Sequence, residues 1–286
     1  RDLHLSIRRQ RQMCIRDSFS TASSEARSAF NNGDMYIEKF VENPRHIEIQ
    51  VFGDGDGRGV YLGERDCSIQ RRHQKVLEET PSPGVTAEEI KEIGEISANA
   101  ISKMKYEGAG TIEFLYEDKH FFFIEMNTRL QVEHPITEAV FGLDLVKEQI
   151  CVASGAGMSF SQGSLKPKGH AIECRINAER LPTFSPSPGN IKEFHCPGGI
   201  GIRMDSAIYN GFTVPPYYDS LIGKLIVHAD DRPMAIRRLA RALDELIIDG
   251  VYTTLDLFKE ILNEEHFKSG EYNIHWLENW LANQVQ

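Results

Sequence analysis

The chain has 286 residues, 41% of them hydrophobic and 26% charged, which is typical of a globular protein with one or two domains. The formal net charge of −10 argues against a general binder of nucleic acid or of anionic membranes, and no apolar run reaches the roughly 20 residues that span a bilayer. Five scattered cysteines without a CxxC pair are typical of reduced thiols in the cytoplasm, rather than of a disulfide framework or a zinc site.

Residues 1–17 differ from the rest of the chain. They are strongly basic, show no apolar periodicity that would bury a face, and lack the apolar core of a signal peptide. We interpret this segment, and its RQMCIRDS portion above all, as a sequence of cloning origin joined to a natural gene; the alternative is a basic targeting arm. The fold is therefore predicted from residue 18 onward.

The part that follows is predicted to contain one helix and three strands. Asn32-Gly33 is a common left-handed stop for the helix, and the DGDG turn at 54–57 joins the last two strands. The helix covers residues 20–31, and the strands cover 35–40, 46–52 and 59–63.

Residues 64–79, ERDCSIQRRHQKVLEE, carry little apolar content and are not expected to form a core element. Two interpretations stay open, a solvated loop or helix face and a cationic wall that faces a phosphate or carboxylate. Thr86 and Glu89 then form a capping box, which predicts a helix that runs to about residue 106.

A hairpin at residues 111–126 is the centre of the prediction. Its strands, 111–117 and 121–126, are rich in aromatic and β-branched residues, and a three-residue turn is expected at 118–120. This register places Glu113 directly opposite Glu125.

Two opposed carboxylates repel each other unless a cation lies between them. With Asn127 on the same face, Glu113 and Glu125 are hard oxygen ligands suited to Mg²⁺ or Mn²⁺. The alternative is an exposed acidic face on an ordinary hairpin. A dense polar run within nine residues of Glu125 favours the metal site: Arg129, Gln131, Glu133 and His134.

The remainder alternates between helices and strands, and a polar loop at 159–168 suggests a boundary. We expect an α+β fold with domains at 18–157 and 158–286. The predicted helices cover 136–141, 143–154, 232–246, 254–263 and 275–282, and the predicted strands cover 170–177, 189–195, 201–205, 220–228 and 247–250.

Several long runs of residues 18–286 resemble biotin carboxylase, the ATP-grasp subunit of bacterial acetyl-CoA carboxylase. The matching runs are EKF at 38–40, ENPRHIEIQ at 42–50, ERDCSIQRRHQKV at 64–76, FIEMNTRLQVEHPITE at 123–138, GHAIECRINAE at 169–179, PPYYDSLIGKLI at 215–226 and NIHWLE at 273–278. The resemblance implies an ATP-grasp fold followed by a biotin carboxylase C-terminal domain.

The resemblance also implies a reaction. ATP phosphorylates bicarbonate, and the carbon dioxide that is released carboxylates biotin. In this interpretation Lys75, Arg129 and the Val132 backbone bind bicarbonate, Glu133 is the general base, Arg129 also steadies carboxyphosphate, and Arg175 stabilises the negative charge on biotin. The strand pattern alone indicates instead that Arg175 is a plain surface residue.

The implied cofactors are ATP, two Mg²⁺ or Mn²⁺ ions and biotin as a carried substrate, with Glu113, Glu125 and Asn127 as metal ligands. The other implied nucleotide contacts are Glu38, Lys39, Val41, His46, Gln70, His73, Ile274 and His275.

The glycine-rich loop and the N-terminal domain of the family precede the part that matches, and residues 1–17 stand in their place. We therefore expect a truncated chain with impaired turnover. The resemblance further implies a cytoplasmic homodimer that works with a biotin carboxyl carrier protein and carboxyltransferase subunits, and with neither nucleic acid nor a membrane.

Two alternatives stay open. The chain could be the equivalent portion of propionyl-CoA, methylcrotonyl-CoA, pyruvate or urea carboxylase, which share this chemistry. It could instead be a non-catalytic module for subunit contact, in which case Glu125→Gln would leave partner binding unchanged.

Overall fold

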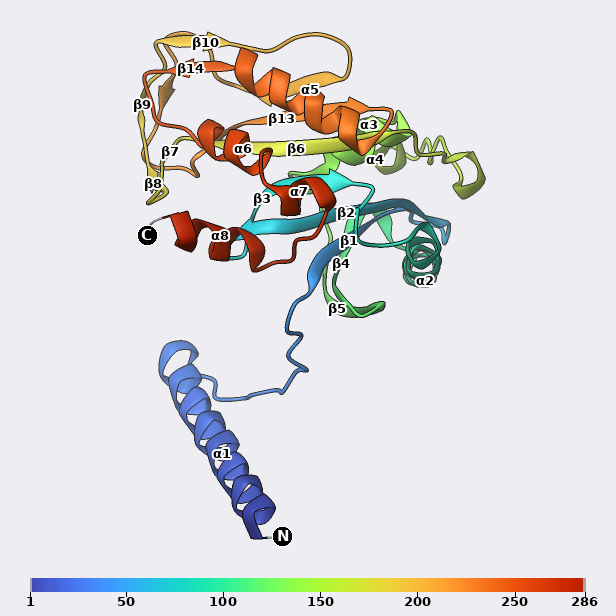
Figure 1. The fold of residues 1–286 in the computed structure, drawn as a ribbon. Coiled ribbons are helices and arrows are strands. Elements are labelled where there is room, and N and C mark those ends of the chain that lie inside the picture. Colours follow the sequence, from blue (N-terminus) through green and yellow to red (C-terminus); the bar gives the residue numbers. More distant parts are fainter. Residues whose placement is uncertain (1, 285–286) are drawn as a thin grey trace. The chain divides into compact units, whose positions relative to one another are not determined.

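The computed structural model describes residues 2–284. The chain divides into two compact units, Arg1–Glu42 and Asn43–Gln286, and each is described by itself (Figure 1). Within the described residues, no helix combines the length and the apolar character that crossing a bilayer requires.

The first unit begins with a long helix, α1 (Asp2–Phe30). The helix predicted at residues 20–31 therefore starts much earlier, inside the segment that shows no apolar periodicity. An α-helix makes its hydrogen bonds locally, and Arg, Gln and Leu favour it, so a helix exposed to water needs no apolar stripe. The helix is followed by Asn31, whose φ of 55° is left-handed, rather than by the predicted stop at Asn32-Gly33.

The strand predicted at residues 35–40 is wrong, because residues 32–41 form neither strand nor helix. A strand needs a hydrogen-bonded neighbour. The described residues of the first unit offer no second strand with which this segment could pair.

The second unit is built on one eight-stranded sheet, in which every neighbouring pair is antiparallel (Figure 1). The strand order is β11-β13-β6-β3-β2-β1-β4-β5. The predicted α+β class is confirmed. The strands are β1 (Arg45–Asp54), β2 (Gly59–Arg71), β3 (Gln74–Thr80), β4 (Glu107–Glu117), β5 (His120–Asn127), β6 (His170–Asn177), β11 (Ile202–Ser206) and β13 (Leu221–Ala229).

Helices cover both faces of this sheet. On one face α5 and α6 pack against Ile172 and Cys174 of β6, and on the other α3 packs against Ala171. The helices are α2 (Ala87–Met104), α3 (His134–Phe141), α4 (Leu145–Ala153), α5 (Arg232–Glu245), α6 (Leu255–Ile261), α7 (Glu265–Ser269) and α8 (Trp276–Gln284), with a 3₁₀ turn η1 at Gln162–Ser164. Helix α7 has five residues and was not predicted.

Short strands form three further pairs. The strand predicted at 189–195 is split, because its first part pairs with β12 and its last part with β14. The short strands are β7 (Glu179–Arg180), β8 (Ser185–Pro186), β9 (Gly189–Asn190), β10 (Glu193–His195), β12 (Thr213–Val214) and β14 (Ile247–Asp249).

Residues 64–79 are not a solvated loop or helix face. They continue β2 and, after a turn at Arg72-His73, form most of β3, and the side chains of residues 64–70 are buried. The expectation that this segment is too polar for a core element is therefore wrong. Many of its polar groups are paired within the protein, for example Arg65 with Glu48 of β1 and Thr111 of β4.

One sheet runs through both halves of the second unit. Strand β3 pairs with β6 over four residue pairs, from Leu77↔Cys174 to Thr80↔Ala171. Residues 157–158, where the domain boundary is expected, lie in the loop between α4 and η1. The side chains that extend from β3 and β6 therefore meet on a common surface.

Candidate active site

A cavity of about 730 Å³, which we call the site cavity, lies over the polar side of β1, β3, β4 and β5. Ten of the residues predicted for the site line it: His46, His73, Lys75, Glu113, Glu125, Asn127, Arg129, Val132, Glu133 and Arg175. It is also lined by Gln131, which belongs to the polar run that favoured a site here, and by residues that were not predicted, namely Gln74, Asn177, Tyr218, Asp219 and Leu221.

The hairpin of β4 and β5 brings Glu113 and Glu125 together as predicted, because they are direct partners in the register. The predicted three-residue turn is wrong. The turn has two residues, Asp118 and Lys119, with φ of 50° and 64°, and this arrangement suits the twist of a hairpin. An extra residue, Ile124, lies between the partners of Glu113 and Phe114 and forms a bulge that restores the pair.

Asn127 completes this group. Its Nδ2 donates to Glu113 Oε1 at 3.1 Å and to Glu125 Oε1 at 3.2 Å, and its Oδ1 accepts from Arg129 Nη2 at 3.3 Å. Two carboxylates and one amide oxygen are the hard donors that Mg²⁺ and Mn²⁺ bind. Because Glu125 is exposed to the cavity, the donor set fits a divalent ion shared with a ligand from solvent.

Lys75 is the centre of the charged network. Its Nζ donates to Glu48 Oε2 at 2.5 Å, Glu133 Oε1 at 2.6 Å and Glu113 Oε1 at 3.0 Å. Burial by itself would lower the pKa of Lys75, but the surrounding carboxylates outweigh it and raise the pKa. Lys75 therefore stays positively charged in this site.

The two carboxylates below Lys75 are held ionised. Burial would raise the pKa of Glu48, but Arg65 and Lys75 lower it to about 2. Burial also opposes ionisation of Glu113, yet a hydrogen bond with His46 and the charge of Lys75 bring a net lowering of its pKa. The floor of the cavity is thus a fixed arrangement of charges.

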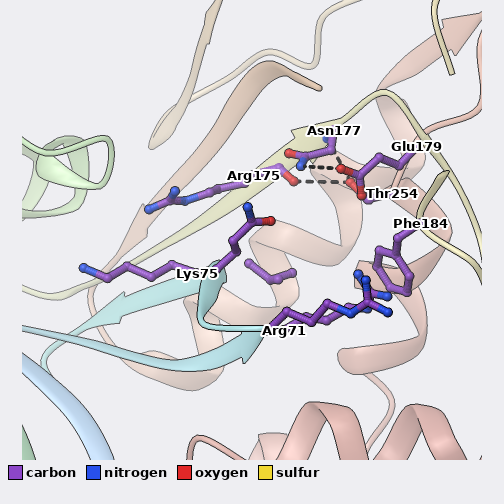
Figure 2. Close-up of a pocket in the computed structure, with 10 residues that line it drawn as sticks. Arg71, Lys75, Arg175, Asn177, Glu179, Phe184 and Thr254 are labelled. Carbon is purple, nitrogen blue, oxygen red and sulfur yellow. Dashed lines mark hydrogen bonds between the residues drawn. The ribbon is translucent and has the colours of Figure 1, made fainter. Parts of the chain in front are cut away.

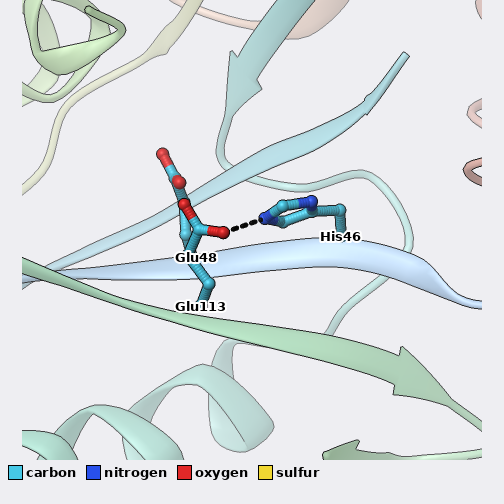
Figure 3. Close-up of side chains that lie close together, drawn as sticks. All are labelled: His46, Glu48 and Glu113. Carbon is cyan, nitrogen blue, oxygen red and sulfur yellow. Dashed lines mark ion pairs between the residues drawn. The ribbon is translucent and has the colours of Figure 1, made fainter. Parts of the chain in front are cut away.

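A second candidate group of metal ligands consists of His46, Glu48 and Glu113. The ligand atoms of these three residues lie within 4.8 Å of one another (Figure 3). However, Glu48 binds Arg65 through Oε1 and Lys75 through Oε2. Arg65 and Lys75 thus already neutralise Glu48, and the trio lacks the exposed carboxylate that Glu125 gives the hairpin group, so it fits a metal ion less well.

Arg175 is not a plain surface residue, as the strand pattern alone suggested. Its Nε donates to Glu78 Oε1 at 2.6 Å and its Nη2 to Glu133 Oε2 at 2.9 Å, and the side chain is 19% exposed. Glu133 is thereby held between Lys75 and Arg175. A carboxylate fixed by two cations beside a cavity is well placed to accept a proton from a bound anion.

Arg129 and Val132 lie at the cavity wall. Arg129 is exposed and donates to the Leu130 carbonyl at 3.4 Å. The Val132 carbonyl accepts from Lys224 Nζ at 2.8 Å, which ties this loop to β13. The loop is therefore anchored beside an exposed, positively charged side chain that can meet an anion.

A smaller side cavity of about 270 Å³ adjoins the first and shares four lining residues with it, of which Lys75 and Arg175 are charged and Gln74 and Asn177 are not. Figure 2 shows these two charged side chains extending away from Arg71 and Phe184, so their charged ends belong to the site cavity. Arg71 lies over the ring of Phe184, 4.0 Å from its centroid. The basic side chains of residues 64–79 thus line two cavities: Arg71 and Arg72 line the side cavity, and Lys75 lines both.

The remaining predicted residues lie outside the lining. Gln70 is buried in β2 opposite Lys75, and the Ile274 amide donates to the Pro44 carbonyl, next to His275 and the start of β1. The other three predicted residues belong to the first unit: Glu38, Lys39 and Val41.

The prediction from sequence missed the residues that support the site from below. Arg65 is fully buried and donates to side chains of β1, β4 and the α3 region: Glu48, Gln50, Thr111, Gln131 and Thr137. A signal was present, since the alternation in residues 46–50 places Glu48 and Gln50 on the face that also carries His46. Nothing local pointed to Lys224.

The comparisons with known proteins agree with this geometry. The carbamoyl-phosphate synthase L chain ATP-binding domain matches residues 8–160, and the biotin carboxylase C-terminal domain matches residues 173–279. A biotin carboxylase of Haemophilus influenzae is 56% identical over 268 residues, which are 94% of this chain and 60% of the relative. A pyruvate carboxylase subunit of Methanothermobacter thermautotrophicus is 51% identical over 92% of this chain and 54% of its own length.

Among solved structures, the biotin carboxylase domain dimer of Hydrogenobacter thermophilus 2-oxoglutarate carboxylase, in complex with MgADP, ADP and bicarbonate, superposes with a TM-score of 0.86 at 45% identity. That match covers 92% of this chain and 58% of the other. The chain thus spans about three-fifths of the length of the relatives it matches. On the two domain matches and the identity over nearly all of its residues, the chain belongs to the biotin carboxylase family.

Proposed function

We propose that this chain belongs to an enzyme that carboxylates biotin on a carrier protein at the expense of ATP and bicarbonate, as the first half-reaction of acetyl-CoA carboxylase in fatty-acid synthesis. The observation that carries the proposal is the meeting of Lys75, Arg129, Glu133 and Arg175 in one cavity, beside the opposed pair Glu113–Glu125. Anion-binding cations, a fixed carboxylate and hard metal ligands are together what phosphoryl transfer to bicarbonate requires.

In this proposal Lys75, Arg129 and the Val132 backbone hold bicarbonate. Glu133 takes its proton, and the bicarbonate oxygen attacks the γ-phosphorus of ATP, which breaks the bond to ADP and forms carboxyphosphate. Carboxyphosphate then separates into phosphate and carbon dioxide. The released phosphate takes the proton from N1 of biotin, and Arg175 steadies the negative charge on the ureido oxygen while N1 attacks the carbon dioxide.

The nucleotide end of the site is proposed from the residues that match the family runs. Glu113, Glu125 and Asn127 would hold two Mg²⁺ or Mn²⁺ ions, whose chemistry is to neutralise the charge of the ATP phosphates. The nucleotide itself would be contacted by Glu38, Lys39, Val41, His46, Gln70, His73, Ile274 and His275.

The proposed setting is the cytoplasm, with a homodimer, a biotin carboxyl carrier protein and carboxyltransferase subunits as partners. Support comes from the Hydrogenobacter thermophilus domain, which is described as a dimer. We further propose that residues 18–157 form an ATP-grasp domain and residues 158–286 the C-terminal domain; because the family match begins at residue 8, residues 8–17 are not proposed as foreign to the family.

A second candidate is the biotin carboxylase part of a pyruvate carboxylase. The 51% identity to the Methanothermobacter thermautotrophicus protein favours it as an alternative. Both candidates share the site chemistry and differ in the carrier they serve. Binding of the chain to the biotinylated carrier of each system would separate them.

The central test is Glu125→Gln in the full chain. This change removes one carboxylate of the hairpin pair, so we expect Mg²⁺-dependent ADP binding to weaken roughly tenfold or more, with the far-ultraviolet circular dichroism unchanged. Glu107→Gln is the matched control, because Glu107 is an exposed carboxylate at the other end of β4. Equal metal-dependent binding in both variants would favour the non-catalytic module instead.

A further inference from the structure

Two fully buried carboxyl groups face each other below Arg175. Glu78 of β3 and Glu173 of β6 are direct partners in the register, and both are 0% exposed. Side chains of directly opposed residues start from Cβ atoms about 5 Å apart, within reach of each other. Among the described residues, no hydrogen-bond partner exists for Glu78 Oε2 or for either oxygen of Glu173.

Apolar side chains cover Glu173 on its face of the sheet. Its partner on β13 is Ile226, and α3 covers the same face with Ile136 and Val140. On the opposite face of β6, α5 contributes to an apolar core. An ionised carboxylate without a partner is very costly in such a place.

The nearby cations are already paired. Arg175 binds Glu78 and Glu133, Lys75 binds Glu133 and two further carboxylates, and Lys224 lies 3.5 Å from Asp205. The other charged groups of α3, His134 and Glu138, pair with each other and with Arg203. None of these groups donates a hydrogen bond to Glu173.

Burial and the charge of Glu78 raise the pKa of Glu173 well above its usual value. Burial, the stronger effect, also raises the pKa of Glu78, to about 7, although Arg175 opposes it. Two carboxyl groups at such a separation in an apolar interior cannot both ionise.

We propose that Glu173 is held as the neutral acid, that its O–H donates to Glu78 Oε2, and that the pair is a positioning device that aims Arg175 into the site cavity. One proton then pairs Glu78 Oε2 with one of the two Glu173 oxygens, and the other Glu173 oxygen becomes an uncharged carbonyl. Glu78 remains an anion and keeps Oε1 for Arg175 Nε. The use made of Arg175 rests on the proposed function, whereas the shared proton does not.

The protonation is tested by infrared difference spectroscopy of the full chain at neutral pH, with and without ¹³C-labelled glutamate carboxyls. We expect a C=O band of a protonated carboxyl that disappears in Glu173→Gln. Glu64→Gln is the matched control, because Glu64 is also buried but accepts a hydrogen bond from the Ser82 amide. Absence of such a band, or its survival in Glu173→Gln, would overturn the proposal.

The positioning role is tested by NMR of the Arg175 Nε–H group. Glu173→Gln can still donate to Glu78 through its amide, so hydrogen exchange at Nε should stay within about twofold of the wild type. Glu173→Ala removes the donor, and Glu78→Gln leaves a single, uncharged acceptor oxygen for both Arg175 Nε and Glu173; we expect at least tenfold faster exchange in both. Unchanged exchange in the alanine variant would refute the positioning role.

A functional readout separates this inference from the proposed function. If the wild-type chain binds bicarbonate, Glu173→Ala should weaken that binding several-fold. Glu173→Gln should bind bicarbonate with an affinity close to that of the wild type. If bicarbonate does not bind to any variant while the infrared and exchange results hold, the proposed function fails and the proton-sharing pair stands.

Discussion

At the scale of single residues, the site depends on Lys75 as the common partner of three carboxylates. Its side chain is 12% exposed, and those of Glu48 and Glu133 are almost completely buried. Removing one member of a buried ionic group leaves the others uncompensated, and this costs much more than the net value of the pair. The lysine therefore stabilises the floor of the cavity, in addition to its proposed role in binding an anion.

We predict that Lys75→Met lowers the free energy of unfolding by about 3 kcal/mol, because it removes the cation that Glu48, Glu113 and Glu133 share and leaves one oxygen of each buried carboxylate uncompensated. Chemical denaturation at neutral pH measures the change. The matched control is Lys91→Met on α2, whose ion pair with Glu95 is exposed and should contribute less than about 0.5 kcal/mol. Equal losses in the two variants would contradict the account of the network.

The residues of the site could be predicted only in part. The hairpin pattern pointed to Glu113, Glu125 and Asn127, and the resemblance pointed to Lys75 and Glu133. Neither pointed to Glu78 or Glu173. The reason is distance along the chain, since the bond from Arg175 to Glu78 joins residues 97 positions apart.

At the scale of elements, the β4–β5 hairpin shows how a correct register can be predicted together with a wrong turn length. A three-residue loop and a two-residue loop followed by a bulge both place Glu113 opposite Glu125. Without the bulge at Ile124, Glu125 would point to the other face of the sheet. The bulge is therefore what keeps the two carboxylates on the cavity side.

Helix α2 begins at a capping box that the sequence predicted and the structure confirms. Thr86 Oγ1 accepts from the Glu89 amide, and Glu89 Oε2 accepts from the Thr86 amide. We predict that Thr86→Ala lowers the free energy of unfolding by about 1 kcal/mol and that Thr86→Ser stays close to the wild type. Urea denaturation of the three proteins checks this, and an unaffected alanine variant would show that the cap is not needed.

The apolar residues of α2 are not all buried against the sheet. Ile90 and Ile101 are buried against the sheet, whereas Met104 is 58% exposed. Helical spacing indicates which residues share a face but does not indicate where the sheet ends beneath it. The last turn of α2 extends beyond the strands it covers.

At the scale of the whole molecule, Glu79 joins the two halves of the second unit. It is fully buried in β3, and its carboxylate accepts hydrogen bonds from side chains of β6, α5 and the segment after α7: His170, Arg232 and Tyr272. Burial would raise the pKa of Glu79, but His170 and Arg232 lower it to about 2.

This pairing predicts an acid-dependent loss of stability. Because the pKa of Glu79 is lower in the folded chain than its usual 4.5, its contribution is complete above pH 4.5 and is lost as the pH falls from about 4.5 towards 2. Glu79→Gln should be less stable at pH 7 by about 3 kcal/mol, and the gap should narrow at pH 3. Denaturation at both pH values measures it, and a constant gap would argue against the linkage.

What the sequence determined by itself is local. Alternating residues identified β1, β6 and the hairpin, a capping box identified the start of α2, and long runs identified the family. Each of these signals lies within a few turns of chain, where hydrogen bonds and side-chain periodicity are set by near neighbours.

Only the tertiary structure decided the rest. The polar segment 64–79 became a buried hairpin because its charges meet partners on β1, β4 and β6, and residues 35–40 formed no strand because they found no neighbour in their unit. Lys75 meets Glu133 across 58 residues of chain. Such encounters depend on the order of strands in the sheet, which no local pattern encodes.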